Sequence, residues 1–339
     1  MLTIKIPQNL SLTEAVNFCN RLWQTEQVEE VTFDFSRLGH VEPFTMAFVA
    51  MEISRFTELL SDTSFFADNF EHHTYAAHMG FFKAFGLDYG NDPGEASGSS
   101  TYIPLTIVKV DDLQRRAVES YESVGNVIEG ESNKLAKILT RQQDGALVDT
   151  LTYSFREIMR NVVEHSQSSV LEYCAQYWPT KNKVEMVVLD SGIGIQASLA
   201  NNPHLTIGSD REALQLALMP TVSGKMFKGL RRRNNDVWQN SGFGLYMTNR
   251  LRRNGGSFFI CSGSSGILLD PKGKSDVRTL FQGTALRMVM NTQNMAGLRD
   301  QLDRYRKEGY AMAKHFSPGT LVEPSIASTM LSRDFADES

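Results

Sequence analysis

Three polar side chains recur at helical spacing near the middle of the chain and could together act on a metal-bound phosphate chain. They are Glu157, Asn161 and His165, each four residues after the one before. A carboxylate can orient water, an amide oxygen can bind the metal ion, and an imidazole can form a hydrogen bond beside them. Because residues four apart lie on one side of a helix, all three are expected to look out from one seam. A solvated helix edge is the alternative interpretation.

The helix that must position these side chains is predicted from Leu151 to Ser166. Its apolar residues recur at helical spacing and form one stripe, which is typical of a helix that lies on a hydrophobic core. The stripe consists of Leu151, Phe155, Ile158, Met159, Val162 and Val163. The three polar side chains therefore border a buried face.

A carboxylate follows at the end of a predicted strand. Strands are expected at residues 170–177 and 183–190, and the second leads into Asp190-Ser-Gly-Ile-Gly. Since this strand is apolar on both faces, Asp190 is expected to face a pocket, where it could accept a hydrogen bond from the amino group of a base. Gly192 and Gly194 permit tight backbone paths beside it.

Two further glycine signals lie downstream. Gly242 and Gly244 open a predicted helix, whose free N–H groups could approach an anion, so a phosphate group would lie at these glycines. Gly283 and Thr284 then enter an alternating strand, and the Thr284 hydroxyl is available to a base or a phosphate. A structural turn explains each glycine signal, taken singly, equally well.

The order of these motifs is more specific than any one of them. Glu-x-x-x-Asn-x-x-x-His, Asp-x-Gly-x-Gly, Gly-x-Gly-Leu and Gly-Thr follow one another within residues 145–292. This order resembles the Bergerat-fold ATPases of the GHKL superfamily, which includes gyrase, heat-shock chaperones, histidine kinases and MutL-type repair proteins. The resemblance implies an α/β two-layer sandwich, a mixed sheet covered by helices, that binds ATP and Mg²⁺.

The resemblance also implies a role for each polar residue. Asn161 would hold magnesium and Glu157 would orient the attacking water. Asp190 would read adenine with Thr284 nearby, and His165 would contact the nucleotide.

The glycines and the segment over the site receive roles in the same way. Gly192 and Gly194 would be lid hinges, whereas the phosphates would be received by Gly242, Gly244 and Leu245. The insert between Ile195 and Asn240 fits the ATP lid of the family, with a helix expected at residues 210–219. Its basic residues are Lys225, Lys228 and Arg231 to Arg233. They form either a solvated loop or a contact to the γ-phosphate, a neighbouring subunit or nucleic acid, and Lys225 is a candidate nucleotide contact.

Residues 1–90 are predicted to form a small α/β domain before this unit. Strands are expected at residues 30–36 and 64–68, with helices from Pro43 to about Leu60 and over residues 72–85. The segment from Phe33 to Pro43 resembles the STAS domain of anti-sigma-factor antagonists. In that register the acceptor serine of the family falls at Pro43, which has no hydroxyl. We therefore expect a STAS-like binding scaffold without a phosphate-accepting switch; a different α/β module is the alternative.

The regions between and after the two domains are simpler. Residues 91–144 should contain a linker, an extended segment and a connecting helix, and the composition of residues 86–100 is typical of a mobile linker. The connecting helix is expected from about Asp111 to Arg141, with a break near Gly125 or Gly130. Residues 293–339 should form a helix, over residues 294–308, and a polar tail.

Composition restricts the class of protein. The 339 residues and 41% apolar content suit a folded protein of two domains, and a net charge of −5 argues against a general nucleic-acid-binding surface. No apolar run approaches the roughly 18 residues of a membrane-spanning helix, and no signal peptide is recognisable, so a cytoplasmic location without membrane contact is expected. The three cysteines are expected to be buried, reduced thiols.

These observations predict a Mg-ATP-binding ATPase that hydrolyses ATP slowly. Lid closure would change its assembly or its contacts with a protein partner, through the lid and the first domain. One alternative is a serine/threonine protein kinase of the anti-sigma-factor type, which transfers phosphate to a separate STAS protein. The other is a nucleotide-sensing regulatory module that does not hydrolyse ATP.

Overall fold

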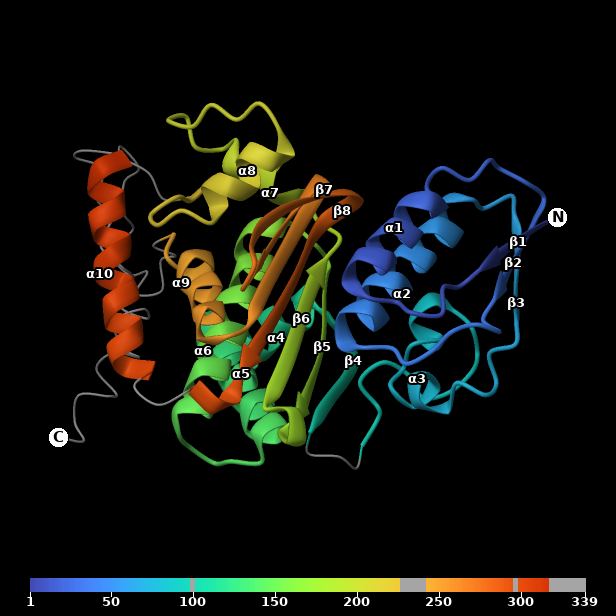
Figure 1. Ribbon diagram of the computed structural model, residues 1–339, viewed down its shortest axis with the longest axis horizontal. Helices are drawn as coiled ribbons and strands as arrows, with labels where there is room; N and C mark the ends of the chain where they lie inside the picture. Colours follow the sequence, from blue (N-terminus) through green and yellow to red (C-terminus); the bar gives the residue numbers. More distant parts are fainter. Residues whose placement is uncertain (98–100, 226–241, 295–297, 317–339) are drawn as a thin grey trace.

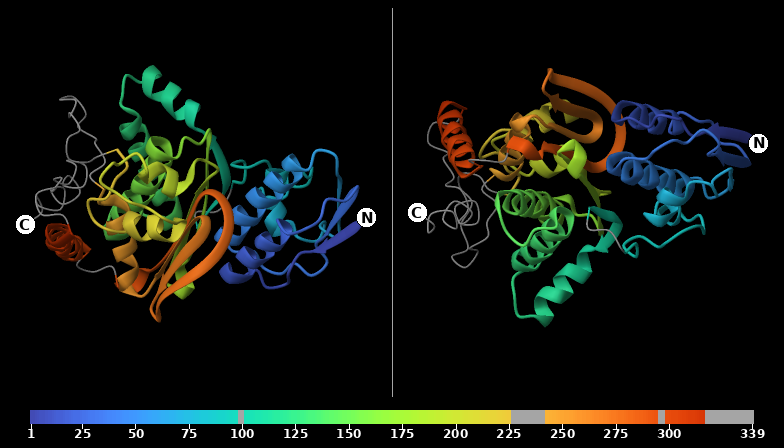
Figure 2. Two further views of the ribbon diagram at one scale, coloured as in Figure 1. Left: turned by 90° about the horizontal axis from the view of Figure 1, so that it is seen from above. Right: turned by 60° about the horizontal axis from the view of Figure 1, so that its bottom comes forward.

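The computed structural model describes residues 1–97, 101–225, 242–294 and 298–316. These residues form a three-stranded sheet, a five-stranded sheet and helices arranged in alternating layers. From the N-terminal side, the small sheet is followed by helices α1 and α2, the large sheet and a second helical layer (Figure 1). The two further views in Figure 2 show the same stacking.

The small sheet is parallel, in the order β1-β2-β3. Its elements are β1 (Leu2–Lys5), α1 (Leu12–Leu22), β2 (Glu30–Asp34), α2 (Pro43–Leu59) and β3 (Ser64–Asp68). The predicted strands at 30–36 and 64–68 and the helix from Pro43 are confirmed. The first strand and the first helix were not predicted. In the structure, the Ser11 side chain caps α1 by accepting a hydrogen bond from the Glu14 N–H.

In residues 86–97, the described part of the segment expected to be a mobile linker, the backbone is instead held by hydrogen bonds. It follows α3 (Thr74–His78) and a 3₁₀ turn, Lys83–Phe85. The Asn91 N–H donates to the Ala77 carbonyl (3.0 Å), and the Gly94 N–H donates to that of Leu105 (2.8 Å). At Gly90, with φ +90°, a Cβ would lie 2.2 Å from the Ala77 oxygen. The glycine-rich composition here reflects close backbone packing.

The large sheet has the strand order β4-β5-β6-β8-β7. The strands are β4 (Tyr102–Lys109), β5 (Val170–Trp178), β6 (Lys183–Asp190), β7 (Ser257–Asp270) and β8 (Gly273–Asn291). Every ladder in it is antiparallel, so the expectation of a mixed sheet is wrong: among the described residues, parallel pairing is confined to the small sheet. Asp190 at the end of β6 lies directly opposite Thr284 on β8.

Helices cover one face of the large sheet. They are α4 (Val110–Glu119), α5 (Val124–Thr140), α6 (Ala146–Asn161) and α9 (Gly244–Leu251). The connecting helix predicted for 111–141 is broken before α5, where the Ser123 hydroxyl caps the new helix by accepting from the Asn126 N–H (3.1 Å). Gly130 lies inside α5 without a break. A further helix, α10 (Leu298–Phe316), lies beside α9 (Figure 1).

The other face of the large sheet is covered by the N-terminal domain. The Phe44 ring on α2 meets the Phe259 ring of β7 at 5.4 Å, and Phe48 stacks on Phe281 of β8 at 4.9 Å. These rings belong to one hydrophobic cluster that extends from the small sheet to the large one. The expected sandwich of one helical layer and one sheet therefore has a third layer, because the N-terminal domain packs on the second face of the large sheet.

A buried carboxylate on the large sheet binds the N-terminal domain. Glu185 on β6 is fully buried, and its Oε2 lies 2.7 Å from Nη2 of Arg287 and 3.3 Å from Nζ of Lys183. Its Oε1 accepts the N–H of Phe44 (3.1 Å) in the first turn of α2, where a negative charge is favoured. Burial favours the neutral acid, but Arg287, Lys183 and this N–H together hold the pKa of Glu185 below its usual value.

Two expectations from composition can be checked in the described part of the chain. The three cysteines, Cys19, Cys174 and Cys261, are buried and free, as predicted. Burial raises the pKa of each thiol, which keeps all three protonated. Over these same residues, no helix has the length and apolar character needed to cross a membrane.

Replacement of the buried carboxylate should loosen the N-terminal domain. We expect Glu185→Ala to lower the free energy of unfolding by about 3 kcal/mol, because Arg287 is left partly buried without its closest partner. The matched control is Glu42→Ala, whose side chain is 41% exposed and pairs with the same Lys183 and Arg287; it should cost less than about 1 kcal/mol. Urea denaturation measures both, and equal losses would contradict the assignment.

Candidate functional site

A cleft opens where the last turn of α6 and the end of β6 lie beside the middle of β8. It contains about 790 Å³ of space free of protein atoms, including its mouth. Residues singled out from the sequence that line it are Asn161, His165, Asp190, Gly194, Gly242, Gly244, Leu245 and Thr284. Residues from separate motifs are therefore brought together, whereas Glu157, Gly192 and Lys225 lie outside the lining.

Asp190 marks the inner end of the cleft. It is only 2% exposed, and its carboxylate accepts hydrogen bonds from the Gly192 N–H (2.9 Å) and from Thr284. Burial raises its pKa to about 6, although these hydrogen bonds favour the charged form. The walls beside it are apolar and include Val188, Ile260 and Leu286. A planar, uncharged ring with a hydrogen-bond donor at its edge fits such a pocket.

The helix that carries the polar triad changes geometry within it. α6 ends at Asn161, and Val162–Ser166 form one π-helical turn where a regular helix was predicted. This turn places the Ser166 carbonyl so that it accepts the Ile193 N–H (2.8 Å), and a Cβ on Gly192 would lie 2.0 Å from the same oxygen. Gly192 is thus required by close backbone packing behind the cleft. Single π turns are frequent at functional sites.

His165 lies on this π turn and lines the cleft. Burial and, to a lesser extent, the nearby cations Lys225 and Arg160 lower its pKa to about 4. The imidazole is therefore neutral at physiological pH. It can form hydrogen bonds with a ligand without adding charge.

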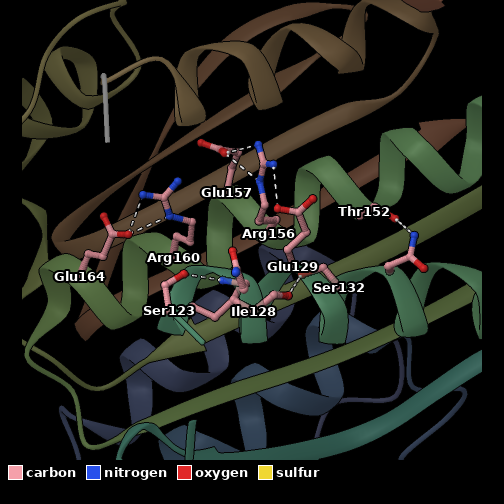
Figure 3. Close-up of polar contacts among 11 residues, drawn as sticks. Ser123, Ile128, Glu129, Ser132, Thr152, Arg156, Glu157, Arg160 and Glu164 are labelled. Atoms are coloured by element: carbon pink, nitrogen blue, oxygen red, sulfur yellow. Dashed lines mark hydrogen bonds and ion pairs between the residues drawn. The ribbon is translucent and has the colours of Figure 1, made fainter. Parts of the chain in front are cut away.

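Glu157 lies one turn before Asn161 and is buried behind the cleft. Its Oε1 accepts from Nη2 (2.9 Å) and Nε (3.2 Å) of Arg156. The Arg156 guanidinium, itself 2% exposed, also lies 3.5 Å from Glu129 of α5, as Figure 3 shows. The second oxygen faces the glycine turn, since a Cβ on Gly244 would lie 2.4 Å from Oε2. The carboxylate thus stands between an arginine and the glycines of the cleft.

A short strap, residues 221–225, borders the cleft beside these glycines. The Thr221 N–H donates to the Gly242 carbonyl (3.1 Å), and the Asn202 amide donates to the Ser223 carbonyl (2.9 Å). The Lys225 ammonium donates to the backbone oxygen of Glu164. Lys225 is therefore placed at the rim, next to the π turn and not in the lining.

The rest of the expected lid is partly described. The predicted helix is present as α8 (Asp210–Ala217), and a shorter helix that was not predicted, α7 (Gly194–Leu199), precedes it. Lys228 and Arg231 to Arg233 of the basic run lie outside the described residues. The proposed contacts of that run consequently stay predictions.

The donor set suits magnesium only together with a ligand that brings oxygen atoms of its own. In the ranges that the structure describes, no three His, Cys, Asp or Glu side chains form a metal-binding group. Magnesium often takes one or two protein ligands and completes its shell with water and phosphate oxygens. The Asn161 amide, which lines the cleft, is the residue that would hold the ion.

Sequence reasoning did not anticipate two residues at the site. Arg156 is adjacent to Glu157 in the chain, but only the buried geometry shows that the two side chains pair. Ser262 lies opposite Thr284 in the β7–β8 ladder and binds the backbone of two other motif segments. Strand register would have been needed to find it.

The raised pKa of Asp190 predicts a pH effect on stability. In the unfolded chain this pKa is near 3.8, so the folded state holds its proton more tightly and the fold loses stability as pH rises from about 4 to 6. Asparagine does not titrate. Across this window, Asp190→Asn should therefore gain up to about 3 kcal/mol of unfolding free energy relative to wild type. Urea denaturation at several pH values measures the difference, and a difference independent of pH would contradict the prediction.

Comparison with known proteins adds nothing to the geometry of the cleft. No family model matches the chain, and no similar curated protein or solved structure is found. The function is consequently inferred from the residues of the cleft.

Proposed function

We propose that this chain is a GHKL-type ATPase that binds Mg-ATP in the cleft and hydrolyses it slowly. The observation that carries the proposal is the convergence of separate motifs on one cleft, whose lining includes both a buried carboxylate and a glycine turn. Lid closure over the nucleotide would then act as a conformational switch for a protein partner or for self-association.

The inner end of the cleft suits adenine. Asp190 can accept a hydrogen bond from the exocyclic amino group while apolar side chains contact the faces of the ring. Guanine carries a carbonyl oxygen at the equivalent position of its ring. That oxygen would face the carboxylate without a donor between them, so ATP should be preferred to GTP.

The glycine turn of the cleft suits the phosphates. Gly242 and Gly244 lie at the start of α9, where free N–H groups and the helix dipole favour an anion. Magnesium held by Asn161 would neutralise part of the phosphate charge. Lys225 at the rim is the nearest described lid cation, and the neutral His165 could hydrogen-bond beside it.

Glu157 supports hydrolysis, and its surroundings favour a slow reaction. One carboxylate oxygen is already occupied by Arg156, so only the oxygen that faces Gly244 is left to orient water. The same pairing is the observation that favours the second candidate function, a nucleotide-sensing module without turnover. In that case the ion pair would keep the carboxylate from water altogether.

A serine/threonine kinase would need a separate substrate protein. The first domain offers no acceptor at the STAS-like position, since Pro43 lacks a hydroxyl. Pro43 is also buried, next to the Phe44 N–H that Glu185 binds, on the face of the large sheet opposite to α6 and α9. Transfer within one chain is therefore disfavoured.

The test is to measure ATP binding by calorimetry and phosphate release over time, with magnesium, for wild type and variants. Asp190→Asn should weaken ATP binding by at least about 30-fold, because a charged acceptor is lost. Glu157→Ala and the closer isostere Glu157→Gln should slow phosphate release by about 100-fold or more and leave affinity within about twofold.

Both alternatives give a result different from that of the ATPase in the same experiment. Binding without phosphate release by wild type would favour the sensing module, or a kinase that lacks its substrate. If wild type binds no ATP, or if Asp190→Asn binds it as well as wild type does, the cleft does not have the proposed role.

A further inference from the structure

Ser262 occupies a junction of three segments that are distant in sequence. Its hydroxyl accepts the N–H of Ile195, at the start of α7, at 2.9 Å and donates to the carbonyl of Gly283 on β8 at 2.7 Å. The residue is 1% exposed and does not line the cleft. The hydroxyl therefore acts both as donor and as acceptor, and both of its hydrogen bonds are to backbone groups beside the cleft.

The register of the sheet places the Ser262 side chain in line with two residues of the cleft. Ser262 lies opposite Thr284, and Thr284 lies opposite Asp190, so the three side chains form a row across β7, β8 and β6. Ile260, two residues earlier on β7, lines the cleft, which places Ser262 on the same face. The ladder shifts register directly after Ser262, so the row coincides with the last regular pair of this part of the ladder.

Glycines on either side leave no room for a different arrangement. A Cβ on Gly194, which has φ +76°, would lie 2.7 Å from the Ser262 hydroxyl. A Cβ on Gly283, which has φ +93°, would lie 2.0 Å from the Asp190 carbonyl. The backbones of the lid hinge and the Thr284 strand can thus approach closely, and the serine hydroxyl bonds them together.

We infer that Ser262 is a positioning residue that couples the start of the lid to the strand that reads the base. This role rests on the proposed function of the cleft. A base bound to Asp190 and Thr284 would restrict the motion of β8 at Gly283. Ser262 bonds Gly283 to Ile195, so the backbone at Ile195 would be restricted too. α7 and the rest of the lid continue from there. Without the hydroxyl, the base could still bind, but the lid would not be ordered with it.

Hydrogen exchange with mass spectrometry tests the coupling. Without nucleotide, Ser262→Ala should speed exchange in peptides covering residues 193–199 by about tenfold, because the Ile195 N–H loses its acceptor. With saturating Mg-ATP, exchange over residues 284–290 should slow in wild type and in Ser262→Ala alike. Exchange over residues 193–199 should slow in wild type only, and ATP affinity should fall about tenfold in the variant.

Two further variants separate this role from general damage. Ser262→Thr keeps a hydroxyl and should restore protection of residues 193–199, at least in part. Ser265→Ala, on the same strand beyond the bulge, should behave as wild type. Thermal unfolding of each variant shows whether it is folded.

Failure of this inference can be told apart from failure of the proposed function. If Ser262→Ala leaves exchange over residues 193–199 unchanged without nucleotide, or if ATP protects these residues equally in both proteins, the coupling is refuted. If wild type binds no ATP but Ser262→Ala still speeds exchange over residues 193–199, the hydrogen bond between Ser262 and Ile195 is confirmed. The proposed function, and with it the coupling to a base, is then refuted.

Discussion

The structure depends on the burial of the five-stranded sheet on both faces. An antiparallel sheet commonly leaves one face to water, but here α5, α6 and α9 cover one face while α1 and α2 cover the other. In β6, every residue after Lys183 is buried. Polar side chains inside this sandwich need partners, as Glu185 has with Arg287, whereas Asp190 reaches the cleft only because β6 ends there.

Because of this constraint, one side of the cleft is formed by sheet strands and the other side by less regular segments. Asp190 and Thr284 sit on paired central strands, so their separation is set by the ladder. The other side of the cleft is built from the π turn, the start of α9 and the strap. The strap bonds to both of its neighbours, through the Thr221 N–H to Gly242 and through Lys225 to Glu164. Under the proposed function, Asp190 and Thr284 would hold the base on fixed strands while the lid closes over the nucleotide.

Some of the fold and most of the cleft could be predicted from sequence, for identifiable reasons. The stripe on α6 and the apolar run of β6 are local signals. β6 lies where it was expected, whereas α6 begins at Ala146, before the predicted start at Leu151, and changes to a π turn after Asn161. Asp190 and Asn161 were expected at the cleft because each marks the end of such an element. Thr284 was expected where a strand begins, but it lies inside the long strand β8 and reaches the cleft because it pairs with Asp190. The proposed roles of these residues are not decided by their placement.

What could not be predicted depends on contacts distant in sequence. β1 is short and pairs with a strand almost thirty residues later, so local alternation was too brief to identify it. The glycine-rich segment after α3 resembled a linker because composition does not distinguish close backbone packing from mobility. The direction of strand pairing, the Arg156–Glu157 pair and the position of Ser262 all follow from tertiary packing alone.

A crystal structure with magnesium and a non-hydrolysable ATP analogue is the most direct test of the central claim. The distance to measure is the one from the adenine amino nitrogen to the nearer Asp190 carboxylate oxygen. We predict a hydrogen-bond distance of about 2.9 Å, with the triphosphate directed toward Gly242 and Gly244. An analogue bound elsewhere, or with its base turned away from Asp190, would contradict the account.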